Sequence, residues 1–263
     1  MYLRAGKTLS LFNGITWQAS SRFEVAAIRE EIDRSVSVMV AENLLPRIGM
    51  REPMQSRRRK RPAELNVLFL SRIHRVKNLD GALRALHGVK GRITFTVYGP
   101  SEDRAYWDDC LGLIRTMPDN VRVQYCGAVT NELVGSIMRD QDLFFLPTRG
   151  ENFGHVIFEA LLGGCPVLIS DQTPWRGLEE KGVGWDLPLT DVQRFRAVLQ
   201  HVTDMGDIEH QRLSQRAAEY ARGICLDESR VERNRALFLE SNQDSEKAAE
   251  TCFPTDHQAR AAA

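Results

Sequence analysis

Apolar and polar residues follow two different periodicities along this chain. Between residues 65 and 170, five short apolar runs follow one another with the sequences LNVLFL, ITFTVYG, VRVQYCG, DLFFLP and CPVLIS. The stretches between them have the three-to-four-residue spacing of amphipathic helices. Strands that alternate with helices predict a parallel sheet covered by helices on both faces. We therefore expect a doubly wound, Rossmann-like α/β domain over residues 64–240, whose ligands bind at the carboxyl ends of the strands.

The first 45 residues show a smaller version of the same pattern. They predict a strand, a helix with a serine cap and a second strand, over residues 15–19, 22–33 and 36–41, with Ser20 and Ser21 as candidate caps. A single strand–helix–strand unit buries too little apolar surface to fold alone. We therefore expect a partner protein or self-association to cover its sheet edge and apolar face.

Residues 46–63 interrupt this pattern with prolines and a basic run, Arg-Arg-Arg-Lys-Arg at 57–61. Such a run is typical of a solvated linker, and adhesion to anionic lipid headgroups at a membrane surface is the alternative. Beyond the sheet, helical periodicity returns over residues 191–205, 209–222 and 228–239. The polar, Ala-rich segment 241–263 has no apolar stripe to bury, which predicts a disordered tail.

The composition is that of an ordinary globular protein, with 43% hydrophobic and 27% charged residues. Thirty-five basic residues balance thirty-five acidic ones, so no overall field favours nucleic acid as a partner. The five cysteines form no Cys-x-x-Cys pair, and no apolar run is long enough to span a bilayer or act as a signal sequence. A reducing cytoplasm is the expected compartment.

Two loops carry the candidate chemistry, and the first follows the first strand of the sheet. It contains Arg72 and Lys77 at the expected carboxyl edge. Arg offers a bidentate fork to phosphate oxygens and Lys a compact point charge, so the two together suit a diphosphate and could take the place of a divalent metal. Solvated loop charges are the alternative.

The second loop follows the apolar run DLFFLP. Its glycines permit close backbone approach, and a helix that begins near Phe153 or Gly154 would direct amide groups at an anion. Glu151 precedes this helix, whereas Glu159 lies inside it, and the helix is expected to pack on the sheet through Val156, Phe158, Ala160 and Leu161. Vicinal ribose hydroxyls are one partner for the Glu159 carboxylate, and a structural ion pair with an arginine is the other.

Three segments together carry a family resemblance. The two glutamates seven residues apart in ENFGHVIFE, the loop SRIHRVKN and the segment ALLGGCPVLISD resemble family 4 of the retaining GT-B glycosyltransferases, over about residues 65–239. The resemblance implies that Arg72 and Lys77 bind the donor diphosphate and that Glu159 binds the nucleotide ribose. It implies a catalytic role for Glu151, which would position the transferred sugar and stabilise charge without acting as a nucleophile. It further implies donor contacts, partly through the main chain, from Phe153, Gly154, His155, Val156, Gly127 and Val129.

The implied reaction moves a hexosyl group from a nucleotide diphosphate sugar to a glycan or lipid-linked acceptor at the cytoplasmic side of a membrane. It would retain the anomeric configuration and need no metal and no further cofactor. Cations and amides around the leaving diphosphate would favour its transition state. A sugar-nucleotide epimerase and a pyridoxal-phosphate phosphorylase share the two-lobe plan, but the spacing of the glutamates and the absence of a matching lysine motif disfavour them.

The chain departs from the family in its amino-terminal lobe, which normally supplies the acceptor site. Only residues 15–41 resemble that lobe, so its two halves cannot close over the donor within this chain. The chain is then the donor-binding half of an enzyme whose other lobe is a separate protein, a truncated product, or a nucleotide-sugar binding module without catalysis.

Three aromatic or imidazole side chains near the loops have bland alternatives. His74 and His155 follow strands but have no neighbouring Cys or His, so we assign no metal to them. Trp175 could shape the rim of the pocket or pack beneath its loop.

Overall fold

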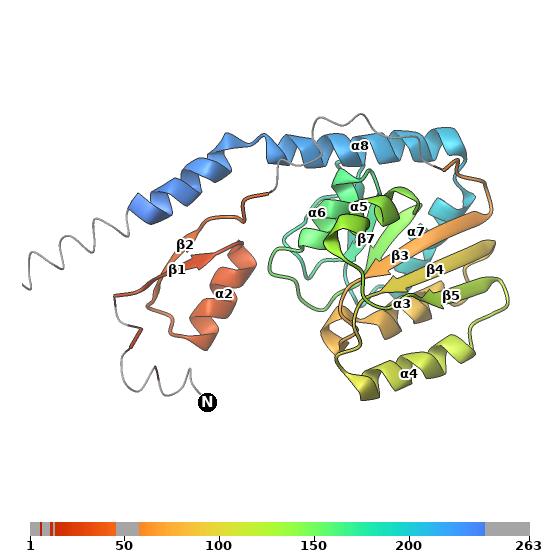
Figure 1. Cartoon of the computed structure of the whole chain (residues 1–263), viewed down its shortest axis with the longest axis horizontal. Coiled ribbons are helices and arrows are strands. Elements are labelled where there is room, and N and C mark those ends of the chain that lie inside the picture. The colour runs from red at the N-terminus through yellow and green to blue at the C-terminus, as the bar shows by residue number, and fades with distance from the viewer. Residues whose placement is uncertain (1–5, 7–10, 13, 46–57, 240–263) are drawn as a thin grey trace, which may run out of the picture. The chain divides into compact units, whose positions relative to one another are not determined.

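A computed structural model describes residues 6, 11–12, 14–45 and 58–239 of the chain. It divides into two compact units, residues 46–226 and residues 1–45 together with 227–263 (Figure 1). The expected division differs in one respect, because residues 227–239 group with the amino-terminal unit and not with the large domain. The predictions for 46–56, for Arg57, for Cys252 and for the tail 241–263 lie outside the described residues.

The larger unit contains a six-stranded sheet in which every pair of neighbours is parallel. The order β5-β4-β3-β6-β7-β8 is built from β3 (Glu64–Leu70), β4 (Arg92–Tyr98), β5 (Val121–Tyr125), β6 (Leu143–Leu146), β7 (Val167–Ser170) and β8 (Gly184–Leu187). The first five strands coincide with the five predicted apolar runs, and the expected doubly wound fold class is confirmed. All residues of β6 and β7 are buried, as expected for strands covered on both faces.

Helices cover both faces of this sheet (Figure 1). They are α3 (Leu79–Leu86), α4 (Arg104–Arg115), α5 (Asn131–Arg139), α6 (His155–Leu162), α7 (Val192–Asp204) and α8 (Asp207–Cys225). Helix α3 contacts α4 and α7, whereas α6 contacts α5 and α8. The chain order reverses between β3 and β6, which are neighbours in the sheet although two strands separate them in sequence. This reversal places a crevice outside the carboxyl ends of β3 and β6, where such folds bind ligands.

The smaller unit contains β1 (Thr16–Ala19), α2 (Arg22–Glu31) and β2 (Ser37–Val40), and its two strands pair in parallel. The Ser21 hydroxyl accepts a hydrogen bond from the Glu24 amide at 3.3 Å, which is the predicted cap. Among the described residues of this unit, the side chains that are both apolar and buried in its strands, helix and connections are Ala19, Ile32 and Ala41. So small a core agrees with a unit that depends on further contacts for its stability.

The helix over residues 228–239 belongs to this smaller unit because it is bonded to Glu42. The Arg233 guanidinium donates to both Glu42 carboxylate oxygens at 2.7 and 3.1 Å, and the Asn234 amide donates to the Glu42 carbonyl at 2.9 Å. Burial acts to raise the pKa of Glu42, but the bonds and charge of Arg233 bring it below its ordinary value. Periodicity predicts this helix correctly, but it cannot show which unit the helix joins.

Candidate functional site

The loop after β3 forms a rigid turn at the carboxyl edge of the sheet. The Ile73 amide donates to the Pro100 carbonyl at 2.8 Å, which ties this loop to the one after β4. A 3-10 turn, η1 (Arg75–Lys77), follows and ends at Asn78 in the left-handed conformation, with φ 59°. This turn buries Lys77, which is 9% exposed, at the end of β3. A lysine at this depth requires a partner.

The loop after β6 is fastened to that turn. The Arg149 amide donates to the Val76 carbonyl at 2.7 Å, and the Asn78 side chain donates to the Pro147 carbonyl at 2.8 Å. The Thr148 hydroxyl donates to the Val76 carbonyl at 3.1 Å. The two loops that carry the candidate chemistry are therefore a single hydrogen-bonded assembly across the switch point. Asn78 and Thr148 escape the sequence analysis because polar loop residues give no signal of what they hold together.

Lys77 and Glu151 lie in direct contact within this assembly. The Lys77 ammonium donates to Glu151 Oε2 at 2.6 Å, and the two side chains are only 11% and 19% exposed. The sequence predicts both residues for the site but not their contact. The pair fixes an ammonium and a carboxylate side by side, so a ligand that carries a phosphate next to hydroxyl groups would find a complementary group for each.

Gly154 stands at the N-cap of α6 in the left-handed conformation, with φ 78°. A Cβ atom there would lie 2.8 Å from Ile157 Cδ1 and 3.0 Å from Glu151 Cγ. Glycine is therefore required both by the backbone and by the position of Glu151. The helix begins at His155, one residue after the predicted start, and a helix start presents amide donors and the positive end of its dipole to an anion.

Aromatic packing supports the start of α6 from below. The Phe153 ring lies 4.7 Å from the His155 ring and 5.8 Å from the Trp175 ring, measured between centroids. Trp175 is 6% exposed, and its indole N–H donates to the Phe153 carbonyl at 2.5 Å. Of the two interpretations of Trp175, packing beneath the loop is the one that the structure shows.

Glu159 lies on the outward side of α6. The buried face consists of Ile157, Phe158, Ala160 and Leu161, so the expected role of Val156 in packing was wrong and Ile157 takes it. The Glu159 side chain reaches solvent, but the surrounding protein desolvates the carboxylate and raises its pKa. In the part of the chain that the structure describes, no arginine pairs with it. The structural ion pair that competed with ribose binding is therefore not found there.

Arg72 takes a different partner from the one that the sequence analysis groups it with. Its guanidinium, 61% exposed, pairs with Glu102 Oε2 at 3.0 Å, on the loop after β4. Within the described residues it makes no ion pair with Glu151 or Glu159. The structure thus joins Lys77 to Glu151 and leaves Arg72 at the outer rim, with Glu102 as a neighbour that the sequence gave no reason to select.

Gly127 and Val129 lie in the loop after β5, at the same edge of the sheet. The Gly127 carbonyl accepts from the Gly99 amide at 2.8 Å, so the loops after β4 and β5 are joined. Gly99 has φ 136°, and a Cβ atom there would lie 1.9 Å from the Ser71 carbonyl oxygen. It is a second residue that the sequence analysis missed. The base-binding role of Gly127 and Val129 stays a prediction.

The residues that the structure describes contain no group of three or more His, Cys, Asp or Glu side chains arranged to hold a metal ion. Residues 140–142 read Asp-Gln-Asp, a spacing that can bind a divalent cation, and the sequence analysis passed over it. Asp142 is 2% exposed, and its carboxylate accepts from Arg58 and from the Asn66 amide, both at 2.8 Å. It lies just before β6, at the amino edge, so it belongs to a structural network.

No helix within the described part of the chain combines the length and the apolarity needed to cross a bilayer. The four described cysteines, Cys110, Cys126, Cys165 and Cys225, are free thiols.

Comparison with known proteins bears on what this arrangement does. The profile of the family described as "Glycosyl transferases group 1" matches residues 51–222. The α-1,3/1,6-mannosyltransferase alg-2 of Neurospora crassa is 31% identical over 122 residues, which are 46% of this chain and 26% of that protein. The match therefore spans about a quarter of the length of this relative.

Two solved structures share the fold. Sucrose-phosphate synthase from Thermosynechococcus elongatus superposes with a TM-score of 0.66 and 19% identity, over 90% of this chain and 61% of that one. The Anabaena protein Alr3699/HepE, in complex with UDP and glucose, superposes with a TM-score of 0.67 and 18% identity, over 92% of this chain and 66% of the other.

Proposed function

Because this chain belongs to the family of group 1 glycosyl transferases, we propose that it binds a nucleotide diphosphate sugar and transfers its hexosyl group to a glycan or lipid-linked acceptor. The observation that carries this proposal is the Lys77–Glu151 pair, 2.6 Å apart at the switch point and directly before the start of α6. The complex of Alr3699/HepE with UDP and glucose supports a donor of this class.

The donor would lie across the carboxyl edge of the sheet with its diphosphate between Lys77 and the first turn of α6. Arg72 would add a guanidinium from the outer rim, once it exchanges Glu102 for a phosphate oxygen. Glu151 would accept hydroxyl groups of the sugar, and Glu159 would accept hydroxyl groups of the ribose. The desolvated Glu159 carboxylate is suited to that role because hydroxyl donors replace the water that it lacks.

In the proposed reaction, the bond from the anomeric carbon to the diphosphate oxygen breaks and a bond from that carbon to the acceptor oxygen forms on the same face. The acceptor proton passes to an oxygen of the leaving diphosphate. Negative charge builds on that diphosphate, where Lys77, Arg72 and the amides of α6 would stabilise it without a divalent metal. Glu151 is a poor candidate nucleophile because its carboxylate is already held by Lys77.

We propose that the acceptor site needs a second lobe, from a separate protein or from another copy of the chain. The smaller unit supports this, because two strands and one helix with so few buried apolar residues cannot form a complete lobe. A lipid-linked acceptor would bring the complex to the cytoplasmic face of a membrane.

A transfer assay tests the proposal. The chain is incubated with UDP-, GDP- and ADP-hexoses and a mixture of glycan and lipid-linked acceptors, with and without a co-expressed candidate lobe. We expect one nucleotide class to be consumed, a glycoside of unchanged anomeric configuration, and activity only with the second lobe. Tight donor binding without transfer under every condition would favour the non-catalytic binding module instead.

Replacement of Glu159 by glutamine tests the ribose contact. We expect the dissociation constant of the donor to rise about tenfold to a hundredfold, as for a lost hydrogen bond to a charged group. In the parent, the raised pKa of Glu159 means that donor affinity falls as pH is lowered through that pKa, because protonation removes an acceptor. Calorimetry from pH 5 to 8 should show this slope in the parent and not in the variant.

The same substitution is expected to increase stability at pH 7 to 8. A carboxyl with a raised pKa binds its proton more tightly in the folded state, so folding is disfavoured as pH rises through the raised value. Glutamine removes that loss, so its melting temperature should exceed that of the parent at pH 8 and approach it at pH 4. A variant that is less stable at pH 8 but binds donor normally would contradict the assignment.

A further inference from the structure

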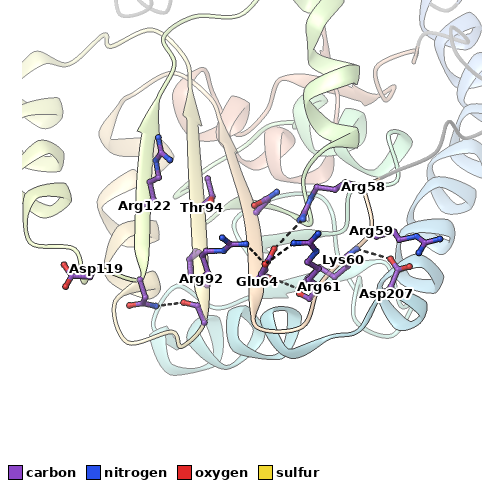
Figure 2. A pocket seen from close by; sticks show the side chains of 14 residues that line it. Arg58, Arg59, Lys60, Arg61, Glu64, Arg92, Thr94, Asp119, Arg122 and Asp207 are labelled. Atoms are coloured by element: carbon purple, nitrogen blue, oxygen red, sulfur yellow. Dashed lines mark hydrogen bonds and ion pairs between the residues drawn. The ribbon is translucent and has the colours of Figure 1, made fainter.

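A second, strongly basic cavity lies at the amino edge of the sheet, where β3, β4 and β5 begin (Figure 2). It has a volume of about 1420 Å³. Because the strands are parallel, this edge is opposite to the one that carries Lys77 and Glu151. Six basic residues and three acidic ones line the cavity, so its positive charge is in excess even when Asp142, behind its wall, is added.

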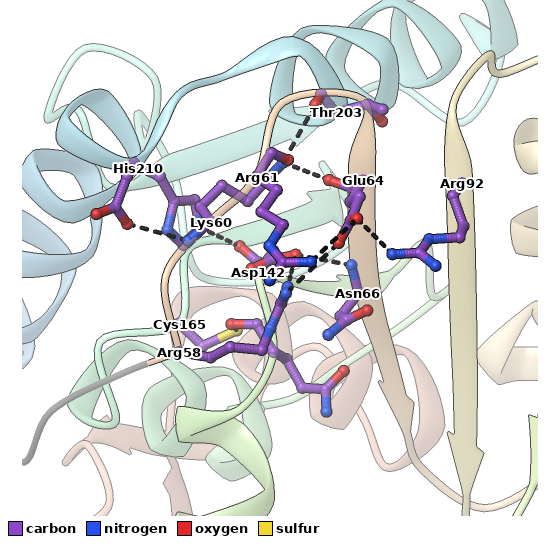
Figure 3. A network of polar contacts seen from close by, with 12 residues as sticks. Arg58, Lys60, Arg61, Glu64, Asn66, Arg92, Asp142, Cys165, Thr203 and His210 are labelled. Carbon is purple, nitrogen blue, oxygen red and sulfur yellow. Dashed lines mark hydrogen bonds and ion pairs between the residues drawn. The ribbon is translucent and has the colours of Figure 1, made fainter.

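The excess charge is concentrated around one carboxylate. Glu64, the first residue of β3, lies 3.8 Å from Arg58, 3.9 Å from Arg61 and in closer contact with Arg92 (Figure 3). Of these three guanidinium groups, Arg58 has a second acidic partner, Asp142. Arg61 and Arg92 are 73% and 72% exposed, so their free donors face the cavity and the solvent. A single carboxylate cannot satisfy three guanidinium forks, each with five N–H donors.

The basic segment that forms one wall is held in place by a buried lysine. Lys60 is 2% exposed, and its ammonium donates to the main-chain carbonyls of Arg61, Glu64 and Thr203. The Lys60 amide also donates to Asp207 at 3.0 Å. The interpretation of this segment as a solvated linker was therefore wrong for its described part, residues 58–61. The arginines on either side of Lys60 are presented from a fixed backbone.

The floor of the cavity is a polar face of the sheet. Asn66, Thr94 and Arg122 are neighbours across β3, β4 and β5, and all three line the cavity. Among its lining residues, Ile93 is the one with a large apolar side chain, and that side chain is fully buried. A surface that binds membranes normally adds exposed apolar anchors to its charge. This cavity is concave and has none among the described residues, which favours a soluble anion over a lipid surface.

We propose that this cavity is a second ligand site, distinct from the donor site, and that it binds a soluble oligophosphate. Arginine forks bind phosphate groups through paired hydrogen bonds, and arginines spread over several strands suit a ligand with more than one phosphate group. Arg61 and Arg92 would grip one end, where they already share Glu64, and Arg122 would bind the other across the sheet. The donor site and this cavity lie at opposite edges, so both can be occupied at once.

The test is a calorimetric titration of the full chain with sodium tripolyphosphate at low salt. The double variant Arg92→Ala/Arg122→Ala removes two cavity arginines, and Arg104→Ala/Arg115→Ala removes two exposed arginines of α4 that do not line it. We expect binding to weaken at least tenfold in the cavity variant and less than twofold in the control. Thermal unfolding of both variants checks that each remains folded at the titration temperature.

Two further arms separate this site from other sources of binding. Lys77→Ala should leave tripolyphosphate affinity at the cavity unchanged, because Lys77 lies at the other edge of the sheet. Vesicles of phosphatidylglycerol should not bind the parent better than the cavity variant. Equal tripolyphosphate binding by the cavity variant and the parent would overturn the proposal, and so would loss of vesicle binding alone in that variant. Either result leaves the proposed donor site unaffected.

Discussion

Replacement of Lys77 by alanine is expected to weaken the binding of a nucleoside diphosphate about 100-fold or more. The substitution removes an ammonium that would bind the diphosphate, a charge-assisted contact worth about 1.5–3 kcal/mol. It also leaves Glu151, 19% exposed, without the partner 2.6 Å away, so an uncompensated carboxylate faces the phosphates. Calorimetric titration with UDP and GDP measures the loss.

The matched control for this variant is Lys90→Ala, which removes an exposed lysine from the loop between α3 and β4. It should leave affinity within about twofold of the parent. The variant Lys77→Ala/Glu151→Gln should recover part of the lost affinity for a nucleoside diphosphate, because it removes the repulsion. If Lys77→Ala binds as tightly as Lys90→Ala, the ammonium does not contact the diphosphate and the site is wrongly placed.

Replacement of Gly99 by alanine is expected to destabilise the larger unit by about 3–5 kcal/mol, through backbone strain and steric overlap together. Gly99 has φ 136°, and the added Cβ would lie 1.9 Å from the Ser71 carbonyl oxygen. The loop before Arg72 must then move away from the loop after β4. Urea unfolding followed by circular dichroism should show the loss, and the melting temperature should fall by about 10 °C.

Gly112→Ala is the control for that experiment. Gly112 lies inside α4, and an added Cβ would meet no atom within 4 Å. Alanine there should stabilise the protein by about 0.5–1 kcal/mol, because it favours the helix and restricts the unfolded chain. A Gly99→Ala protein within 1 kcal/mol of the parent would show that the loops after β3 and β4 are not packed as described.

The sequence predicts most of the fold because the strands of a buried parallel sheet are nearly continuous apolar runs. The exception is β8, whose sequence Gly-Trp-Asp-Leu has no such run, and which forms because it pairs with β7. Gly184 is needed at that pairing, since a Cβ atom there would lie 2.3 Å from the Val167 carbonyl oxygen. A glycine required by a neighbouring strand gives the same sequence signal as one in a loop.

The candidate site is predictable residue by residue but not in its contacts. Residue type marks Lys77 and Glu151 as candidates, whereas their pairing depends on the left-handed turn at Asn78 and on the bonds from Arg149 to Val76 and Asn78. The exchange of partners at Arg72 depends on the loop after β4, which brings Glu102 within 3.0 Å. Such pairings come from tertiary structure, which spacing along one segment cannot encode.

Lys60 shows the opposite limit. A run of five basic residues indicates a solvated segment, since charged side chains seldom lose their water. Here burial, the largest influence, lowers the pKa of Lys60, while three main-chain carbonyls accept from its ammonium. Only the fold supplies those carbonyls, from the basic segment itself, from β3 and from the end of α7.

The central claim is that a nucleotide diphosphate binds at the carboxyl edge of the sheet, between the loop after β3 and the start of α6. The most direct measurement compares nucleoside diphosphate binding by two double variants, Arg72→Ala/Glu159→Ala at that edge and Arg92→Ala/Arg122→Ala at the opposite one. We predict that the first loses affinity more than 100-fold and that the second stays within about twofold of the parent. Undiminished binding by the first variant, or a comparable loss in the second, would contradict the claim.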